Sequence, residues 1–442
     1  MKAAAAVTSF ATWMQATAMD ARWAPVLALR NITEILARTG SDGKASLAVD
    51  YGNSETTEFF DCDNMPLDGV VFPEGLLRLK LHSFKLRAIP PDYLFPSTVD
   101  TIEFPDNDIP ALSASIQWPT ALRTLDLSRN KIQSIDSSLA WPSALTHLDL
   151  STNKLSSFPT PKWPDALEFL SLAGNPVGNV PPNQAWPASL ARLLLANANL
   201  NVFPSSLPLN LKQISLSNNA LPTFPQPNQL PASIEDIDLG GTGLTSVPSK
   251  IEWPHATTLW LGDNAITSLP DDFSVPSSLW DINLANNKIT HLPESGAWLA
   301  SLKSLNLENN VLTSIPEGTT LPSESTVLRG NRITALKKIA LSRMFNIEEN
   351  PLRVISLVTF PPQSYWTTGS IELTEFTLSD AMFQRFKKTT QETFFHPQFT
   401  TNPSAVHATC DAQGGDVKSL GGSITVCVVG PPTELHDIHP FI

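Results

Sequence analysis

The stretch LKSLNLENNVLTSIP, residues 302–316, decides the fold of this chain. It follows the pattern L-x-x-L-x-L-x-x-N-x-I/L-x-x-I/L/F-P, in which Asn310 fills one polar slot between apolar positions. The pattern recurs at steps of 19 to 23 residues, and ten of its thirteen copies carry Asn in that slot. The slot falls on Phe84, Asn107, Asn130, Asn153, Asn175, Ala198, Asn219, Thr242, Asn264, Asn287, Asn310, Asn331 and Asn350. A fixed period of this length is the signature of a repeat architecture.

Each copy of the pattern predicts one short β-strand and one turn of a solenoid. In Leu122, Leu125 and Leu127 the leucines of one copy point inward. One strand cannot bury its apolar face alone, but stacked copies spaced by about 4.8 Å form a parallel sheet over a shared leucine core. Thirteen such strands predict a sheet on the order of 60 Å long. The Asn after each strand should turn inward and bond backbone groups that would otherwise be buried without a partner.

Prolines occur at two fixed places in the repeat. One closes the pattern, as at Pro316, and another follows Trp or an aliphatic residue before the next strand, as at Trp118-Pro119 and Trp141-Pro142. Proline fixes φ and lacks an N–H, so we expect the outer side to consist of loops, 3-10 turns and polyproline-like segments, with few full helices. The periodic tryptophans should stack in the core and not form a ligand cage.

These features resemble the leucine-rich-repeat family and, more narrowly, the ectodomains of leucine-rich-repeat receptor-like proteins. The resemblance implies an α/β solenoid, a leucine-rich-repeat horseshoe of about 13 repeats with a parallel concave β-sheet and a loop-rich convex side. The sequence shows no apolar run of about 18 residues and no HRD or DFG motif. If the resemblance holds, the chain is a secreted form or lacks the membrane and kinase parts. The Trp-Pro repeat departs from the plant-receptor pattern, where Gly precedes Ile-Pro, so the subfamily stays open.

An N-terminal flank, residues 1–75, is expected to cap one end of the array. Residues 1–18 have two interpretations, a cleaved signal peptide or an Ala-rich helix. A helix is predicted over 26–38, because Pro25 suits a helix start and Gly40 a helix end. This arrangement is similar to the N-terminal cap of the receptor ectodomains, although that cap has more cysteines.

Residues 58–75 are predicted to form a degenerate repeat. Phe60 and Cys62 take leucine slots and Met65 takes the Asn slot, which makes Cys62 a buried thiol or a residue paired with an unidentified partner. The regular array follows over residues 76–358.

The C-terminal flank, residues 359–442, is expected to cap the other end. Residues 371–378 alternate like a strand, and Ser379 is placed to cap a short helix. Cys410 and Cys427 lie in two short apolar segments around a glycine-rich stretch, which predicts a hairpin closed by a disulfide if the compartment is oxidising. The pair resembles the C-terminal cap of the receptor ectodomains.

Charge narrows the classes of partner. The formal net charge is −13 and the sequence pI is about 5.0, which argues against a nucleic-acid partner because phosphate needs Lys and Arg clusters. The same balance permits a basic protein or peptide ligand, with simple solubility as the alternative explanation. No segment predicts a membrane span, no pattern predicts a cofactor, and the oligomeric state is not encoded.

The residue between the last two leucines of each copy points away from the core, onto the concave face. Glu103, Asp126 and Asp149 are consecutive there and form an acidic column, while Trp260 stands farther along and Trp280 sits on the next strand. Exposed tryptophans beside charged groups are typical contact anchors. The ligand-binding candidates are Glu103, Asp126, Asp149, Asp238, Trp260, Trp280, Asn283 and Asn306. The alternative is a solvated face with two tryptophans packed on their neighbours.

Three chemical alternatives are less favoured. Cys410 with His407 could form a thiol nucleophile and base, but a structural cysteine is the simpler interpretation. Some bacterial leucine-rich effectors carry a ubiquitin-ligase domain after a similar array, for which the C-terminal flank is short. His436, Asp437 and His439 could bind a metal, although a mobile tail is favoured.

The sequence therefore predicts a non-enzymatic recognition protein with no catalytic residues, cofactor or metal. The leading hypothesis is an extracellular or secreted receptor-like module that binds a protein or peptide. The alternative is a cytoplasmic adaptor or scaffold in signal transduction.

Overall fold

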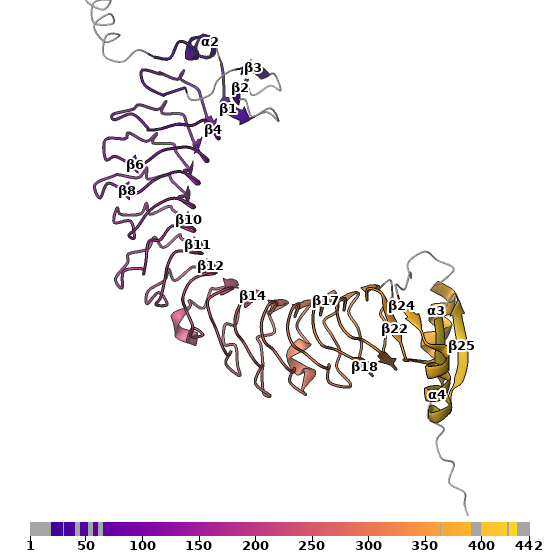
Figure 1. Cartoon of the computed structure of the whole chain (residues 1–442). Helices are drawn as coiled ribbons and strands as arrows, with labels where there is room; N and C mark the ends of the chain where they lie inside the picture. Colours follow the sequence, from indigo (N-terminus) through magenta and orange to yellow (C-terminus); the bar gives the residue numbers. More distant parts are fainter. Residues whose placement is uncertain are drawn as a thin grey trace, which may run out of the picture. The chain divides into compact units, whose positions relative to one another are not determined.

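The repeats fold as short parallel strands, each contributing one turn of a solenoid (Figure 1). The computed structural model describes residues 19–29, 31–39, 45–51, 56–60, 65–362, 364–389, 399–421 and 424–430. The chain divides into two compact units, called here unit 1 (residues 1–221 and 228–234) and unit 2 (residues 222–227 and 235–442).

The sheet of unit 1 begins as an antiparallel meander and continues as a parallel ladder. The meander runs β3 (Thr56–Phe60), β2 (Ala45–Asp50), β1 (Glu34–Thr39). From β1 the parallel order is β4 (Arg78–Leu81), β5 (Thr101–Glu103), β7 (Thr124–Asp126), β9 (His147–Asp149), β10 (Phe169–Ser171), β11 (Arg192–Leu194) and β12 (Gln213–Ser215). Two very short strands, β6 (Ala111–Leu112) and β8 (Ser134–Ile135), pair on the outer side.

The main sheet of unit 2 is parallel throughout. Its order is β13 (Asp236–Asp238), β14 (Thr258–Trp260), β15 (Asp281–Asn283), β16 (Ser304–Asn306), β17 (Ser325–Val327), β19 (Met344–Asn346) and β21 (Tyr365–Thr367). A second sheet runs β18 (Ala335–Lys337), β20 (Val354–Ser356), β23 (Glu375–Ser379), β26 (Ile424–Val429), β25 (Asp416–Gly421), with only the last pair antiparallel. β22 (Ile371–Leu373) and β24 (Phe399–Thr401) form a separate parallel pair.

The central residue of nearly every array strand is buried and its two neighbours face outward. Leu125 and Leu148 are in register on adjacent strands and fully buried, as are Ile282 and Leu305 in unit 2. Complete burial of one such side chain favours folding by about 1.5–3 kcal/mol relative to exposure. The predicted solenoid with a parallel sheet and a shared leucine core is confirmed.

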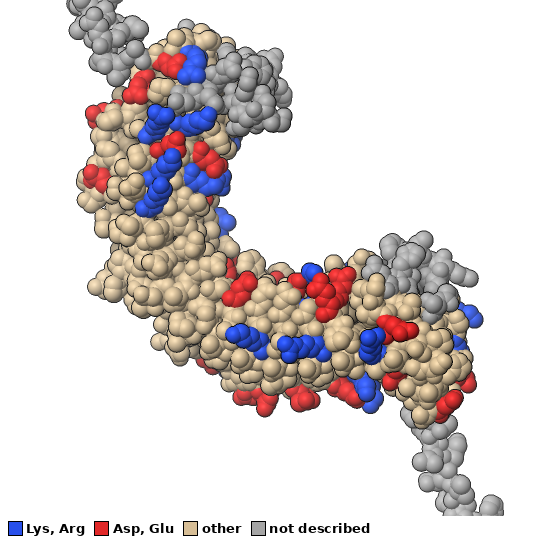
Figure 2. Space-filling view, in the orientation of Figure 1, with Lys and Arg blue, Asp and Glu red and all other residues tan. Residues whose placement is uncertain are grey.

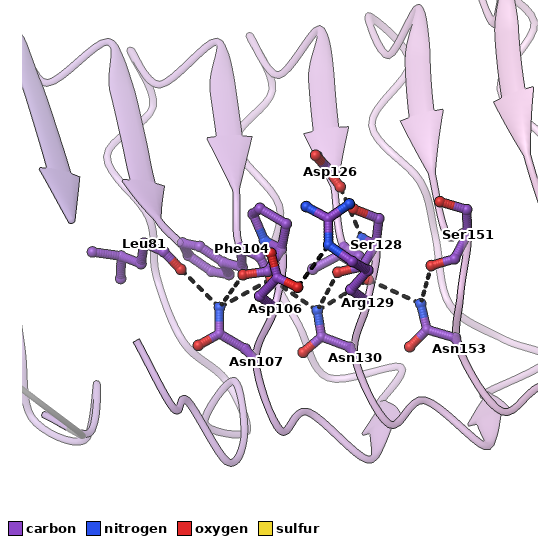
Figure 3. Close-up of polar contacts among 12 residues, drawn as sticks. Leu81, Phe104, Asp106, Asn107, Asp126, Ser128, Arg129, Asn130, Ser151 and Asn153 are labelled. Atoms are coloured by element: carbon purple, nitrogen blue, oxygen red, sulfur yellow. Dashed lines mark hydrogen bonds and ion pairs between the residues drawn. The ribbon is translucent and has the colours of Figure 1, made fainter. Parts of the chain in front are cut away.

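The Asn ladder also lies where the sequence places it (Figure 3). Asn130 is buried, and its Nδ2 donates to the carbonyl oxygens of Phe104 (2.8 Å) and Leu127 (3.0 Å) and lies 3.2 Å from that of Ser128. Its Oδ1 accepts the N–H of Ile109 in the preceding turn (3.1 Å). The side chain thus pairs backbone groups of two turns, and the same pattern is repeated by Asn107 and Asn153, among others.

The turns without Asn replace its bonds locally. At Ala198 the next Asn, Asn219, accepts the N–H groups of both Ala198 and Leu200. At Thr242 the hydroxyl donates to the Leu239 carbonyl at 2.8 Å. At these two turns the hydrogen bonds of the missing Asn are thus replaced in part, by the Asn of the next turn or by the Thr hydroxyl.

The outer side of the array is built from turns and extended segments. Between residues 76 and 358, all of which the structure describes, there are two 3-10 helices, η1 (Pro227–Gln229) and η2 (Gly296–Leu299), and no α-helix. The tryptophans stack as expected. The angle between ring planes is 16° for Trp118 and Trp141 and 20° for Trp141 and Trp163. These rings are buried, which confirms that they belong to the core.

The predicted helix over 26–38 is wrong. Among the described residues of this segment, helix is confined to the end of α2 (Trp23–Leu27), and β1 follows from Glu34. Asn31 adopts a left-handed φ of 58°, which interrupts any helix there. In β1 the buried residues Ile35 and Ala37 alternate and face Val49 and Leu47 of β2, so a period of two determines the structure.

The predicted degenerate repeat over 58–75 is also wrong in its strand. β3 pairs antiparallel with β2, and it is β1 that pairs parallel with the first array strand, β4. The strand beside β4, predicted to come from residues 58–62, is therefore β1. Because β1 also pairs with β2, the meander covers the edge of the array sheet that would otherwise be open. Met65 is fully buried, whereas Cys62 and residues 1–18 lie outside the described residues.

The C-terminal flank begins with β21, which continues the main sheet beyond residue 358, and then has two strands where one was predicted. The segment 371–378 divides between β22 and β23, which belong to different sheets. The helix α3 (Asp380–Thr389) follows, and the Ser379 hydroxyl accepts the backbone N–H of Met382 at 3.3 Å. The capping role expected of Ser379 is therefore present.

Cys410 and Cys427 are joined by a disulfide, with Cα atoms 5.2 Å apart and both side chains fully buried. The predicted hairpin geometry needs correction, because Cys410 lies on the helix α4 (Pro403–Gln413), and only Cys427 lies on the β25–β26 hairpin. The disulfide therefore connects a helix to the sheet beneath it. His407 is exposed on α4 and cannot activate a cysteine that is already bonded. His436, Asp437 and His439 lie outside the described residues.

Candidate ligand-binding face

The candidate site is the face of the sheet that points away from the leucine core, called here the sheet face. Two columns of residues form it, a first column before the buried central residue and a second column after it. In unit 1 the first column is Arg78, Thr101, Thr124, His147, Phe169, Arg192 and Gln213, and the second is Lys80, Glu103, Asp126, Asp149, Ser171, Leu194 and Ser215. In unit 2 they are Asp236, Thr258, Asp281, Ser304, Ser325, Met344 and Tyr365, and Asp238, Trp260, Asn283, Asn306, Val327, Asn346 and Thr367.

All five candidate Asp and Asn residues of the second column also close the end of their strand. In each, one side-chain oxygen accepts the backbone N–H two residues later. The pairs are Asp126 with Ser128 (2.8 Å), Asp149 with Ser151 (2.7 Å), Asp238 with Gly240 (3.0 Å), Asn283 with Ala285 (2.9 Å) and Asn306 with Glu308 (2.9 Å). Such local bonds are a known preference of Asp and Asn at turns, and the sequence analysis missed them. In Asp126 and Asp149 the second carboxylate oxygen can accept a hydrogen bond from a ligand.

Glu103 differs from the other members of the acidic column. Its carboxylate lies 3.0 Å from Nε2 of His82 and 3.6 Å from Nζ of Lys80. The hydrogen bond to His82, with the charge of Lys80 in support, holds the pKa of Glu103 below its usual range. Its charge is already offset within the protein, so Glu103 is a weaker ligand contact than the sequence predicts.

Asp126 and Asp149 form no ion pair with another described residue, although a cation lies near them. Figure 3 shows Arg129 beside Asp106 and Asp126, and its Nε lies 2.6 Å from Oδ1 of Asp106. The bond to Asp106 and the fields of Asp126 and Asp149 raise the pKa of Arg129. The acidic column of unit 1 therefore reduces to two available carboxylates, Asp126 and Asp149.

A three-residue stack crosses the first column of unit 1 and was not predicted. The His147 ring lies parallel to the Phe169 ring, with centroids 3.9 Å apart and planes 2° apart, and the Arg192 guanidinium carbon lies 4.9 Å from the Phe169 centroid. Register places these residues side by side on β9, β10 and β11. Burial lowers the pKa of His147, opposed by the charge of Asp149. The signal was present in the sequence, but only the second column was followed there.

Unit 2 presents exposed aromatic rings. Trp260 is 46% exposed and Trp280 is 42% exposed. Trp260 stands in register between Asp238 and Asn283, whereas Trp280 immediately precedes β15 and donates its backbone N–H to the Thr257 carbonyl. The two residues are thus on adjacent turns but offset along the strand direction by about 10 Å. Both rings are available to a partner, although not side by side.

A second apolar pair lies farther along unit 2. Met344 and Tyr365 are in register on β19 and β21 and are 57% and 61% exposed. Neither was singled out in the sequence, because both belong to the first column.

Charge is distributed unevenly in unit 1. Figure 2 shows a broad region with few charged side chains in the middle of the chain, and residues 169–221 contain only two charged residues, Arg192 and Lys212.

No group of three His, Cys, Asp or Glu residues suited to a metal ion occurs in the described part of the chain. Within the same part, every helix is too short or too polar to cross a bilayer.

Two segments of the chain match models of known protein families. Residues 254–316 match the model described as leucine rich repeat, and residues 120–162 match the model described as leucine rich repeats in two copies. The chain is thus a leucine-rich-repeat solenoid, as its sequence pattern indicates. No curated protein sequence matches it.

Solved structures with a similar fold include three leucine-rich-repeat chains. A leucine-rich-repeat protein of Leptospira interrogans is 22% identical, with 66% of this chain and 75% of that chain covered and a TM-score of 0.46. The leucine-rich effector YopM of Yersinia pestis is 24% identical, with 71% and 78% covered and a TM-score of 0.44. The plant peptide hormone receptor RGFR1, in complex with RGF2, is 20% identical, with 78% and 56% covered and a TM-score of 0.45.

Proposed function

We propose that this chain is a non-enzymatic recognition protein whose sheet face binds a segment of another protein or a peptide. The observation that carries the proposal is the pair of exposed tryptophans of unit 2, Trp260 on β14 and Trp280 immediately before β15. Burying a large aromatic side chain away from water lowers the free energy, and such residues are common anchors of protein interfaces. A sheet with its core on one face can present them without rearrangement.

Carboxylates on the sheet face of each unit support a ligand with basic residues. Asp126 and Asp149 in unit 1 each keep a carboxylate oxygen free of ion pairs, and in unit 2 Asp238 flanks Trp260 while Asp281 directly follows Trp280. A Lys or Arg side chain gains from a carboxylate and from the face of an indole ring. The net charge of −13 would also speed the approach of such a ligand.

We further propose that the protein is an extracellular or secreted receptor-like binding module. The Cys410–Cys427 disulfide supports this setting, because such bonds persist in oxidising compartments. A cytoplasmic adaptor that scaffolds signalling partners is the second candidate. Intact mass of protein from its native source, measured with a thiol label before and after reduction, separates the two. Cys410 and Cys427 protected until reduction would support the first candidate, and three thiols labelled without reduction would support the second.

The binding proposal is tested with a random peptide library displayed against the whole chain. Selected peptides should bind Trp260→Ala at least tenfold more weakly than the unaltered protein, the loss typical of an interface anchor. Leu209→Ala is the matched control, because Leu209 is 84% exposed but lies outside the strands. Peptides that bind both variants and Asp126→Asn/Asp149→Asn as tightly as the unaltered chain would contradict the proposal.

A further inference from the structure

Arg192 is held on the sheet face of unit 1 in a fixed orientation. Its guanidinium lies over Phe169, whose ring is 9% exposed and is covered on another side by the parallel ring of His147. A cation over an aromatic face is stabilised by the ring quadrupole, and the planar guanidinium then has fewer orientations to lose on binding. Its N–H groups remain at the exposed surface of β11.

No carboxylate of the described chain neutralises this guanidinium. Arg78 and Lys80 of β4 are paired with Glu34, and Arg129 is paired with Asp106. Arg192 forms no such ion pair, and between residues 169 and 221 the chain contains no Asp or Glu. A preoriented cation without an internal partner is suited to an anionic group from outside.

We propose that Arg192, supported by Phe169, is the subsite for an Asp or Glu side chain of a peptide bound across the sheet face of unit 1. The inference rests on the proposed function and adds an acidic residue to the basic ligand described above. A carboxylate matches the fork of the guanidinium and can accept two parallel hydrogen bonds.

The register of the strands predicts the spacing of the two charges in the ligand. Asp149 on β9 and Arg192 on β11 are separated by one intervening strand, β10, or about 10 Å across the sheet. The two residues are also offset by two positions, or about 7 Å, along the strands, which makes their separation about 12 Å. An extended peptide advances about 3.3 Å per residue and presents alternate side chains to the same face, so it would carry its basic and its acidic residue about four positions apart. The expected ligand motif is a Lys or Arg and an Asp or Glu separated by three residues.

The test uses a random peptide library displayed with its C-terminus fused, so that every carboxylate comes from a side chain. Selection against the full chain should enrich the spaced basic and acidic pair. A selected peptide, synthesised with blocked ends, should bind Arg192→Gln roughly tenfold more weakly in an anisotropy titration. Replacing its acidic residue with the matching amide should weaken binding equally and remove any further effect of Arg192→Gln.

Two control variants make the result specific. Arg123→Gln removes the same charge from an exposed arginine that no aromatic ring supports, and it should leave affinity unchanged. Arg192→Lys keeps the charge without the fork and should recover only part of the affinity. Equal thermal unfolding of all variants will show that each is folded.

Each other outcome has a definite meaning. Peptides that weaken with Asp126→Asn/Asp149→Asn but bind Arg192→Gln unchanged would overturn this inference and leave the proposed function standing. Peptides indifferent to every sheet-face variant, or a selection that yields none that respond, would contradict both. A selected set that needs a free C-terminal carboxylate when synthesised would overturn the assignment to a side chain.

Discussion

The inside of the repeat and its sheet face are formed by alternate residues of the same short strands. The inward residues are nearly the same in every turn of the solenoid, whereas the outward residues differ. Inside, Asn130 and Asn153 make the same backbone bonds one turn apart, over leucines in identical register. On the sheet face, the residues one position away change from turn to turn, from an ion-paired Glu103 to a stacked Phe169 to an exposed Trp260. The residues that repeat are those that stabilise the fold, and the residues that vary are those available for recognition.

The largest loss of stability is expected from the core. Leu148→Ala should lower the free energy of unfolding by about 2–5 kcal/mol, because the fully buried side chain leaves a cavity between Leu125 and Leu170. Leu194→Ala is the matched control on the half-buried sheet face and should cost clearly less. Urea unfolding measures both, and similar losses for the two variants would remove the distinction between inside and face.

The Asn ladder should come next. Asn130→Ala leaves the N–H of Ile109 without its partner, at about 1–3 kcal/mol if water does not reach it. The carbonyls of Phe104 and Leu127 lose one donor but keep a second one, from Asn107 and Asn153. Asn306→Ala, in which the lost side chain accepts one backbone N–H at the surface, should cost about 0.5–1.5 kcal/mol. Equal midpoints in urea for the two variants would mean that the ladder adds nothing beyond a surface turn.

Acidification should weaken unit 1 in two steps. The pKa of His147 is lowered from 6.5 in the folded protein, so the unfolded chain takes up a proton more readily and stability falls as pH drops below about 6.5. The pKa of Glu103 is lowered from 4.5, so its contribution is present above that value and is lost as pH falls through the folded pKa.

Urea midpoints measured from pH 8 to pH 3 check both steps. His147→Gln should flatten the upper part of the profile and Glu103→Gln the lower part. A profile that rises on acidification, or that neither variant alters, would disagree with the electrostatics described for the sheet face.

The smallest effect on stability is expected from the available carboxylates. Asp126→Asn keeps the side-chain oxygen that accepts the Ser128 N–H and removes only the charge, so unfolding should change by less than about 0.5 kcal/mol. Binding of a selected basic peptide should nevertheless weaken, and its dependence on salt should decrease. A loss of stability without any change in binding would assign Asp126 to the fold alone.

The array could be predicted from the sequence because its physical cause is periodic. Leucine spacing and the slot that holds Asn130 define the strand, the bend and which side chains point inward. The outward positions of Asp126 and Trp260 then follow by counting. The flanks have no such repetition. Residues 26–38 satisfy helical spacing, but the left-handed φ of Asn31 and the partner strand β2 make residues 34–39 a strand.

Long-range contacts account for the rest of what was missed. Cys410 and Cys427 were paired from their number and spacing, but whether Cys410 lies on a helix or a strand depends on the sheet against which it packs. The stack of His147, Phe169 and Arg192 joins residues that are distant in sequence and become neighbours only through register. Counting along both columns of the face would have found it.

Hydroxyl-radical footprinting of the whole chain, with and without a selected peptide, tests the central claim most directly. If the sheet face is the recognition surface, oxidation of Trp260 and Trp280 should fall on binding, while the exposed Leu94 and Leu209, which lie outside the named strands, keep their reactivity. Protection of Leu94 or Leu209, with both tryptophans still fully reactive, would contradict the account.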